Sequence, residues 1–321
     1  MEEHHTEHYT EHHEHREEHR ETIPLKQKFE KGYNKNYKLL LLIPAIILIL
    51  SLIQLGYSYS QNGDFIEKDI TLTGGTSITI LIQDSEISIN QLSNFLSNNI
   101  GDFSIRELSD FRSGQQKAVI VETVLGPNEI RPFVEEYLGY ELTTENSSIE
   151  STGSSLGESF YNQLRIAILI SFILMAIIVF FIFRTFVPSA AVVISAFADI
   201  IMTLAFVNVL GIKVSSAGIT AILMLIGYSV DSDIMLTTRL LKRHGETNKN
   251  LFGAFKTGIT MTLTSIVALT VALVITQSFS EVLQQIFTIL LIGLGFDIMN
   301  TWITNVSILK WHLDVKNKGN N

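Results

Sequence analysis

The sequence contains no cysteine and only five prolines, and charged residues make up 17% of its 321 residues. The absence of cysteine excludes disulfide bonds, thiolate nucleophiles and cysteine-ligated metal sites. The sequence also lacks a Walker-type phosphate loop, a G-x-S-x-G elbow, an H-E-x-x-H motif and a dinucleotide-binding fingerprint. We therefore expect no enzymatic activity and no cofactor.

Long apolar runs take the place of these motifs. Leu39–Leu55 and Ile166–Phe183 carry no charge over 17 and 18 residues. At about 1.5 Å per residue, a helix of this length approaches the ~30 Å thickness of the hydrocarbon layer. Hydropathy predicts six membrane helices, at roughly 39–56, 164–183, 189–210, 214–236, 257–276 and 282–308. The fold class is therefore a polytopic α-helical membrane protein.

The net charge of −9 is unevenly distributed. Residues 1–22 carry −6, 23–55 carry +4, 56–162 carry −11 and 163–321 carry +4. This alternation argues against nucleic acid binding and for an oriented membrane protein. The basic residues of the short connections fall on one side, namely Lys26, Lys28, Lys31, Lys35, Lys38, Arg184, Arg239, Lys242, Arg243, Lys249, Lys310, Lys316 and Lys318. The positive-inside rule then places both termini in the cytoplasm and residues 56–162 outside the cytoplasmic membrane.

The outer block is expected to be a compact α+β domain. Alternating and helical apolar patterns predict strands at Ser77–Ile82, Asp102–Leu108, Ala118–Thr123 and Glu141–Ile149, and helices at Gln91–Leu96 and Glu129–Leu138. This β-α-β-β-α-β order is the ferredoxin-like arrangement. The expected organisation is a tail and basic flank (1–36), a first membrane helix (37–56), the outer domain (57–160), a five-helix bundle (161–310) and a cytoplasmic tail (311–321).

The N-terminal segment Met1–Thr22 has seven histidines and eight glutamates and almost no apolar residues. It is expected to be disordered, because it cannot bury enough surface to offset the entropy of ordering. His4, His8 and His12 are spaced by four and would share one face of a helix, where they could bind Zn²⁺ or Ni²⁺. A solvated low-complexity arm without metal is the favoured interpretation.

Four carboxylates fall inside the predicted membrane helices, at Asp199, Asp231, Asp233 and Asp297. An aspartate at the centre of a membrane helix costs ~2.5–3.5 kcal/mol, so it normally faces a protein interior or a water path. Gly227, Asp231 and Thr238 share one helical face, whereas Asp233 points about 200° away from Asp231. Asp233 lies near the cytoplasmic end, where a structural role is an equal alternative.

A desolvated carboxylate binds a proton readily and releases it when it meets water or a cation. We therefore predict a proton relay, with Asp231 as the carrier and Asp199 and Asp297 as its partners. Arg239 or Lys256, with Thr238, would modulate the relay. Thr257, Thr260 and Thr264 would line a polar seam on the fifth helix, with hydrogen bonding to their own helix as the alternative.

Several short motifs resemble the SecF family of protein-export membrane proteins, and its archaeal members more than its bacterial ones. The motifs are Gly74-Gly75-Thr76 after Asp69, Ser155-Leu156-Gly157 with Gln163, Phe197-Ala198-Asp199, Gly227-Tyr228-Ser229-Val230 followed by Asp231, and Asp297 with Thr301-Trp302. The resemblance covers residues 39–311. Bacterial members have Asn at the position of Asp231 and Asp-Arg at the position of Thr238-Arg239.

The resemblance implies one half of a resistance-nodulation-division type transporter that pairs with SecD and associates with a SecY-type channel. Proton flow would then help to pull a translocating polypeptide outward, and Asp231→Asn would abolish this function without preventing membrane insertion or SecD association. Two alternatives remain: half of a small-molecule or lipid exporter of the same superfamily, and a purely structural scaffold for SecD or the channel.

Overall fold

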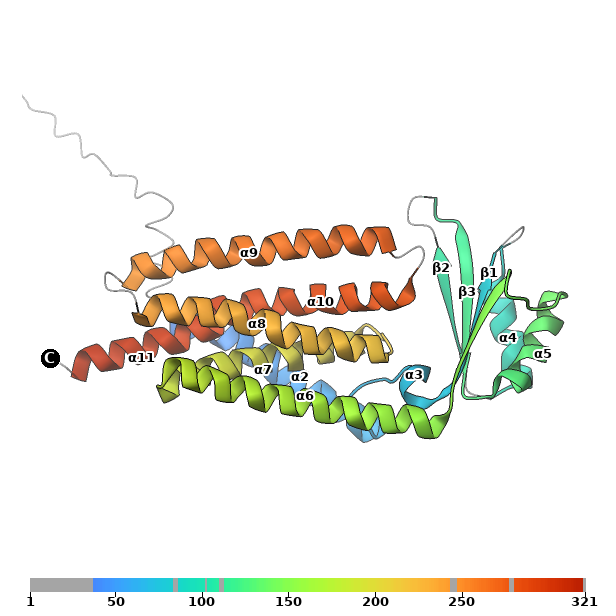
Figure 1. Ribbon diagram of the computed structural model, residues 1–321, viewed down its shortest axis with the longest axis horizontal. Helices are drawn as coiled ribbons and strands as arrows, with labels where there is room; N and C mark the ends of the chain where they lie inside the picture. The colour runs from blue at the N-terminus through green and yellow to red at the C-terminus, as the bar shows by residue number, and fades with distance from the viewer. Residues whose placement is uncertain are drawn as a thin grey trace, which may run out of the picture. The chain divides into compact units, whose positions relative to one another are not determined.

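The computed structural model describes residues 37–82, 86–101, 103–109, 113–242, 247–276 and 280–319. The elements, labelled in Figure 1, are α2 (Leu42–Asn62), α3 (Ile70–Thr73), β1 (Gly75–Leu81), α4 (Ile89–Asn99), β2 (Phe103–Ser109), β3 (Gln116–Thr123), α5 (Pro127–Leu138), β4 (Ser147–Thr152), α6 (Ser154–Phe183), α7 (Phe186–Val209), α8 (Ser216–Lys242), α9 (Thr247–Thr276), α10 (Glu281–Met299), the π-helix η1 (Asn300–Asn305) and α11 (Val306–Gly319). The predicted N-terminal tail, with His4, His8 and His12, lies outside the described residues.

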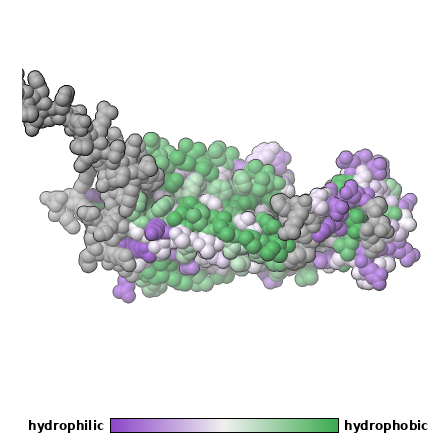
Figure 2. All heavy atoms as spheres, turned by 90° about the horizontal axis from the view of Figure 1, so that it is seen from above, coloured by the Kyte–Doolittle hydropathy of each residue, from purple (hydrophilic) through white to green (hydrophobic). Residues whose placement is uncertain are grey.

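Within the described residues, six helical stretches are long and apolar enough to cross a membrane. They are Tyr37–Gln61, Ser154–Phe183, Phe186–Val209, Ser216–Leu241, Leu251–Thr276 and Val282–Val315. Hydrophobic residues make up most of the visible surface of these helices, whereas the outer domain is largely hydrophilic (Figure 2). The prediction of a multi-pass helical membrane protein with an α+β domain between its first and second membrane helices is therefore confirmed.

The helices are not equally shielded from the surroundings. In an apolar stretch of 18 residues within each span, 61% of the residues of α7 and 56% of those of α8 are buried. The share is 17% for the α2 and α6 spans and 11% for the α9 span. Val192 and Ala196 of α7 pack with Ile222 and Leu225 of α8 in the core of the bundle. Polar side chains on the inner faces of α7 and α8 are therefore removed from both lipid and water.

Several membrane helices extend well beyond their predicted bounds, including α9, which begins at Thr247 rather than near residue 257. Helix α6 begins ten residues before the predicted start, because its first turn packs on the loop before β1: a Cβ at Gly157 would lie 2.8 Å from the Gly74 backbone nitrogen. The last span continues through η1 into α11, where Lys310 and Asp314 interrupt the apolar pattern that hydropathy follows.

The outer domain is a four-stranded antiparallel sheet of order β2-β3-β1-β4. Helices α4 and α5 cover the face that points away from the membrane helices (Figure 1). Ile78 and Ile80 of β1 meet Leu92 of α4 and Val134 of α5 in its core. The predicted β-α-β-β-α-β order is confirmed.

The predicted strand at Glu141–Ile149 is wrong in its first half, since β4 begins at Ser147. Asn146 Oδ1 accepts a hydrogen bond from the Thr143 backbone N–H at 2.7 Å, and Ser147 N–H donates to the Thr143 carbonyl at 2.9 Å. These bonds form a turn that competes with extended backbone. The one-turn helix α3, which the apolar pattern did not predict, begins where Asp69 Oδ1 accepts from the Thr71 N–H at 3.1 Å.

The chain segment that leads into the outer domain is hydrogen-bonded to the loop between α7 and α8. Asp69 N–H donates to the Val214 carbonyl at 3.0 Å, and Val214 N–H donates to the Glu67 carbonyl at 2.7 Å. Ser216 N–H also donates to Thr71 Oγ1 at 3.1 Å. The base of the outer domain is thus fixed to the bundle by main-chain bonds.

Four charged side chains gather at this junction and form what we call the junction cluster: Asp69, Arg106, Glu122 and Lys213. Arg106 forms an ion pair with Glu122 and lies 3.8 Å from Asp69 Oδ2, and Lys213 Nζ lies 3.8 Å from Glu122 Oε2. Each buried acid therefore faces at least one cation. Burial raises the pKa of the Asp69 carboxyl above its ordinary value, and the nearby Glu122 raises it further.

Candidate functional site

Three carboxylates meet in the interior of the membrane bundle, one from each of three helices. Asp199 lies on α7, Asp233 on α8 and Asp297 on α10, and their side chains are 0%, 0% and 1% exposed. We call them the membrane triad. None of the ion pairs formed within the described residues includes a member of the triad.

Asp199 is held entirely by neutral donors. Ser229 Oγ of α8 donates to Asp199 Oδ2 at 2.5 Å, and Asn300 Nδ2 of η1 donates to Oδ1 at 2.7 Å. Both carboxylate oxygens are therefore hydrogen-bonded, and helices α7, α8 and η1 are joined through this one group.

Asp297 has a similar environment. Ser232 Oγ lies 3.1 Å from Asp297 Oδ1 and 3.4 Å from Oδ2, and Thr301 Oγ1 donates to Oδ1 at 3.2 Å. Ser232 also lies within bonding distance of the Ser229 carbonyl and of Thr301 Oγ1. A hydroxyl has a single proton, so Ser232 can donate to only one of these acceptors at a time.

Asp233 differs from the other two because only one of its oxygens is hydrogen-bonded. Asn305 Nδ2 donates to Asp233 Oδ1 at 2.7 Å. Within the described residues no donor lies within 3.5 Å of the buried Asp233 Oδ2, and the Ser195 and Thr301 hydroxyls lie beside the carboxylate.

The π-helical turn η1 contacts all three members of the triad. Asn300 binds Asp199, Thr301 binds Asp297 and Asn305 binds Asp233. The wider turn of a π-helix rotates successive side chains by less than an α-helix does, and such turns occur often at functional sites. A change in charge at one carboxylate therefore acts on the turn that holds the other two.

The structure brings two of the three predicted relay residues together. Asp199 and Asp297 lie in one buried cluster, as expected of interacting partners, but Asp231 does not join them, because its side chain is exposed. Asp231 therefore lies outside the buried cluster, and its role as the proton carrier stays a prediction. Helix α8 instead buries Ser229, Ser232 and Asp233, and at 100° per residue this turns Asp231 outward.

The predicted modulating residues lie elsewhere. Arg239 Nη1 donates to the Gly253 carbonyl at 2.7 Å and to Thr257 Oγ1 at 2.9 Å, so it joins α8 to α9. The next residue inward, Thr238, is half-buried, and Lys256 is exposed. The hydroxyls of Thr260 and Thr264 donate to carbonyls one turn earlier in α9, at 2.7 Å each. For these threonines the structure supports the alternative interpretation, in which they bond to their own helix.

The motif glycines and their neighbours divide into two groups. Gly74 and Gly75 have φ of +82° and +138°, and a side chain at either position would meet neighbouring backbone. Thr76 Oγ1 donates to the Leu125 carbonyl at 2.7 Å, so this motif builds the base of the outer domain. Gly227 and Tyr228 are exposed, whereas Ser229 donates to Asp199.

A repeated spacing could have identified the triad from the sequence. Ser195, Asp199 and Thr203 of α7 are spaced by four, and so are Ser229, Asp233 and Thr237 of α8. Asp297, Thr301 and Asn305 repeat the interval in the third helix. Residues four apart share a helical face, so each carboxylate lies on a polar stripe. This signal favours Asp233 over Asp231.

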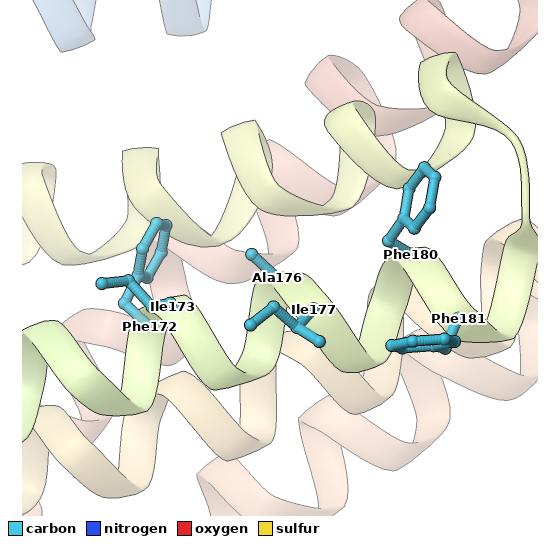
Figure 3. A pocket seen from close by; sticks show the side chains of 6 residues that line it. All are labelled: Phe172, Ile173, Ala176, Ile177, Phe180 and Phe181. Carbon is cyan, nitrogen blue, oxygen red and sulfur yellow. The ribbon is translucent and has the colours of Figure 1, made fainter.

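An apolar hollow of about 580 Å³ lies on α6 and is lined by Phe172, Ile173, Ala176, Ile177, Phe180 and Phe181. Figure 3 shows all six side chains along this one helix. The lining contains no polar group and most of these side chains are exposed, as expected of a lipid-facing surface. The hollow therefore supplies no chemistry to the site.

Comparisons with known proteins extend over nearly the whole chain. Residues 135–315 match the family described as "Protein export membrane protein SecD/SecF, C-terminal". The SecF of Methanolacinia petrolearia is 37% identical over 290 residues, which cover 89% of this chain and 98% of that protein. The SecF of Methanocaldococcus jannaschii is 37% identical over 288 residues, covering 87% of this chain and 96% of the relative.

A solved structure shares the fold. The crystal structure of SecDF, a translocon-associated membrane protein from Thermus thermophilus, matches with a TM-score of 0.70 at 18% sequence identity. The match covers 87% of this chain and 38% of the SecDF chain, so this chain spans about two fifths of that protein.

Proposed function

The chain belongs to the SecF family of protein-export membrane proteins, and from that premise we propose that proton uptake and release at Asp199 and Asp297 couple its auxiliary role in export to the proton motive force. The observation that carries the proposal is the membrane triad: three carboxylates from three helices, buried with neutral donors and no ion pair.

Negative charge in this environment is costly. Burying an ionised carboxylate without a cation costs several kcal/mol, and the cost is removed when the group takes up a proton. One elementary charge that crosses the membrane potential is worth ~2.3 kcal/mol per 100 mV. A triad that is loaded from one side and unloaded to the other therefore draws work from the potential.

The structure also supports a path from proton uptake to movement. Asn300 and Thr301 of η1 donate to Asp199 and Asp297, and η1 continues directly into α11. Protonation of either carboxylate removes the acceptor that these donors bind most strongly. The turn then no longer holds α7 and α10 in fixed positions relative to each other, and the bundle repacks.

The exposed face of α8 supports a partner. Asp231 lies well inside the α8 span, on a face that also exposes Gly227 and Tyr228. A carboxylate that faces lipid costs ~2.5–3.5 kcal/mol on insertion scales, so a second protein is needed to cover it. We propose that SecD occupies this face in a heterodimer and that the pair associates with a SecY-type channel and with the translocating polypeptide, without enzymatic activity of its own.

The orientation follows from the distribution of basic residues. Arg184, Arg239 and Lys310 lie at one end of the membrane helices, and Lys213 lies at the end that carries the outer domain. By the positive-inside rule both termini are cytoplasmic and the outer domain lies outside.

The test is gradient-driven export in vesicles that contain this chain, SecD and a SecY-type channel. Asp199→Asn and Asp297→Asn are expected to lose at least about tenfold of the export increment that an imposed proton gradient produces, while export without the gradient is unchanged. Glu158→Gln, an exposed acid on α6, is the matched control and should respond normally. A normal gradient response in both triad variants would leave only a scaffold role, and small-molecule efflux without any export defect would favour the exporter alternative.

A further inference from the structure

Two sequences of the form Asn-x-Ser/Thr, the acceptor pattern for N-linked glycosylation, occur in the chain in contrasting surroundings. Asn146-Ser147-Ser148 lies in the outer domain, in the turn that leads into β4, and Asn305-Val306-Ser307 lies in the last membrane span. Such a sequence is modified only at the protein surface, where its asparagine amide can reach the transferring enzyme. The structure therefore distinguishes the two asparagines by their accessibility.

The acceptor sequence in the membrane is closed to any enzyme. Asn305 is 0% exposed and Ser307 is 2% exposed. Asn305 Nδ2 donates to Asp233 Oδ1 at 2.7 Å in the interior of the bundle. Asn305 is therefore an internal negative control for the other asparagine.

The acceptor sequence in the outer domain is open. Asn146 is half-buried, and Glu145 before it and Ser148 after it are exposed. Within the described residues, β4 is an edge strand that pairs with β1 alone. The free side of β4 leaves Ser147 and Ser148 accessible to an enzyme that binds its acceptor as an extended chain.

The Asn146 side chain can carry a sugar without loss of the native turn. Its Oδ1 accepts from the Thr143 N–H at 2.7 Å, and its Nδ2 donates to the Glu141 carbonyl at 3.0 Å. The amide nitrogen has two hydrogens, and a single one is enough for the bond to Glu141. Replacement of the other hydrogen by a sugar keeps both hydrogen bonds.

We propose that Asn146 is an N-glycosylation site and that the donor is an oligosaccharide carried on a lipid phosphate or diphosphate. Nδ2 loses one proton to a base of the transferring enzyme and forms a bond to the anomeric carbon of the sugar. The bond from that carbon to the phosphate oxygen breaks, and the lipid phosphate leaves with the electron pair. The Ser148 hydroxyl serves in recognition by the enzyme.

A glycan at this position acts on the edge of the sheet. A free edge strand is a template for pairing with another chain, and a bulky, hydrophilic group at its start hinders such pairing. The glycan would therefore protect β4 from edge-to-edge association of outer domains.

The inference rests on the proposed orientation, because the donor and the enzyme act outside the cytoplasmic membrane, and two measurements keep the two claims apart. The chain has no cysteine, so Glu136→Cys, at an exposed position of α5, provides a single thiol. A membrane-impermeant maleimide should label it in intact cells. In parallel, peptides that contain Asn146 and Asn305 are analysed by mass spectrometry, from the full chain purified from native membranes.

The expected result is a glycan on the Asn146 peptide and an unmodified Asn305 peptide. Asn146→Gln and Ser148→Ala should each lose the glycan completely, so that the full chain has the mass of its sequence. Ser148→Thr should keep the glycan. Ser147→Ala is the matched control and should also keep it, because it removes a neighbouring hydroxyl without changing the acceptor pattern.

Three results would overturn the proposal: an unmodified Asn146 in a chain that is labelled from outside, a glycan that persists in Ser148→Ala, and an equal loss of the glycan in Ser147→Ala and Ser148→Ala. Labelling of Glu136→Cys only after the membrane has been opened would overturn the orientation together with the site. A failed proton-gradient test would remove the coupling at the membrane triad and leave the glycosylation site in place.

Discussion

The junction cluster and the membrane triad are both groups of buried acids, and they are compensated in opposite ways. At the junction, Glu122 is 3% exposed and faces the cations of Arg106 and Lys213. In the triad, Asp199 and Asp297 are as deeply buried but meet only hydroxyl and amide donors. A paired acid fixes one structure, whereas an acid held only by neutral donors can change its charge without leaving a cation unpaired.

This difference assigns different tasks to the two ends of α8. At the outer end, ion pairs and main-chain bonds hold the base of the outer domain against the bundle. Further along the helix, Ser229 and Ser232 contact the buried carboxylates of Asp199 and Asp297, at which we propose proton exchange. Variants of the two clusters should therefore fail in different ways.

Arg106→Ala is expected to have the largest effect on stability. It leaves Glu122 and Asp69 buried with Lys213 as the remaining nearby cation, and removal of one partner from a fully buried pair costs about 3–5 kcal/mol. Because the Arg106 side chain is 37% exposed, we expect about 2 kcal/mol, measured by thermal unfolding of the full chain. Arg131→Ala on α5, whose partner Glu135 is an i,i+4 neighbour, should cost less than about 1 kcal/mol. Equal effects would mean that the junction is no more than a surface ion pair.

Ser229→Ala tests the other half of the comparison. It removes the donor of Asp199 Oδ2 and should destabilise the chain by about 1–2 kcal/mol, the cost of an unsatisfied buried acceptor. The loss should shrink on acidification, because a protonated carboxyl needs fewer donors. Thr220→Ala, which removes an exposed hydroxyl bonded within α8, should change stability by less than about 0.5 kcal/mol. A pH-independent loss in Ser229→Ala would contradict charge exchange at Asp199.

The sequence was sufficient to predict the architecture because the bilayer and the sheet impose simple periods. Apolar runs of helix length predicted all six spans, and alternation with helical spacing predicted the order of the outer domain. The ends of elements were less accessible. The start of α6 depends on a close approach between Gly157 and Gly74, which are 83 positions apart in the chain and which no local pattern connects.

The site shows the same division between local and tertiary information. The cost of a charge in the membrane selected four aspartates, and three of them, Asp199, Asp233 and Asp297, belong to the triad. The choice between Asp231 and Asp233 depends on which face of α8 is buried. Hydropathy alone did not identify that face, because Gly227 and Tyr228 interrupt the apolar pattern. The four-residue polar stripes carried that information, and the π-turn that joins them is visible only in three dimensions.

Asp69→Asn should have a small effect whose pH dependence is informative. The pKa of Asp69 is raised from 3.8 by burial and by Glu122, so the folded chain binds this proton more tightly than the unfolded chain. Its contribution is therefore most favourable below about pH 4 and is lost as the pH rises through the folded pKa. Because asparagine also caps helices, the variant should keep α3 and should be more stable relative to the native chain at pH 7 than at pH 4. Chemical unfolding at pH 4 and pH 7 measures the free energy of unfolding of the variant and of the native chain. If the difference between them is the same at both pH values, Asp69 does not titrate on folding.

Asp231→Asn is expected to have the smallest effect on the isolated chain and a distinct effect on its complex. The side chain is exposed, so the loss of its charge should change the free energy of unfolding by less than about 0.5 kcal/mol or raise it slightly. If SecD covers this face, a polar group of SecD must meet the carboxylate, and the amide should weaken co-purification of the two chains, which reverses the expectation from the sequence that SecD association is unaffected. Asp233→Asn reverses the pattern, because the Asp233 side chain is buried and bonded to Asn305 of this chain: it should change the response to a proton gradient while SecD association stays intact. If the two variants behave identically, α8 has no separate inner face for coupling and outer face for assembly with SecD.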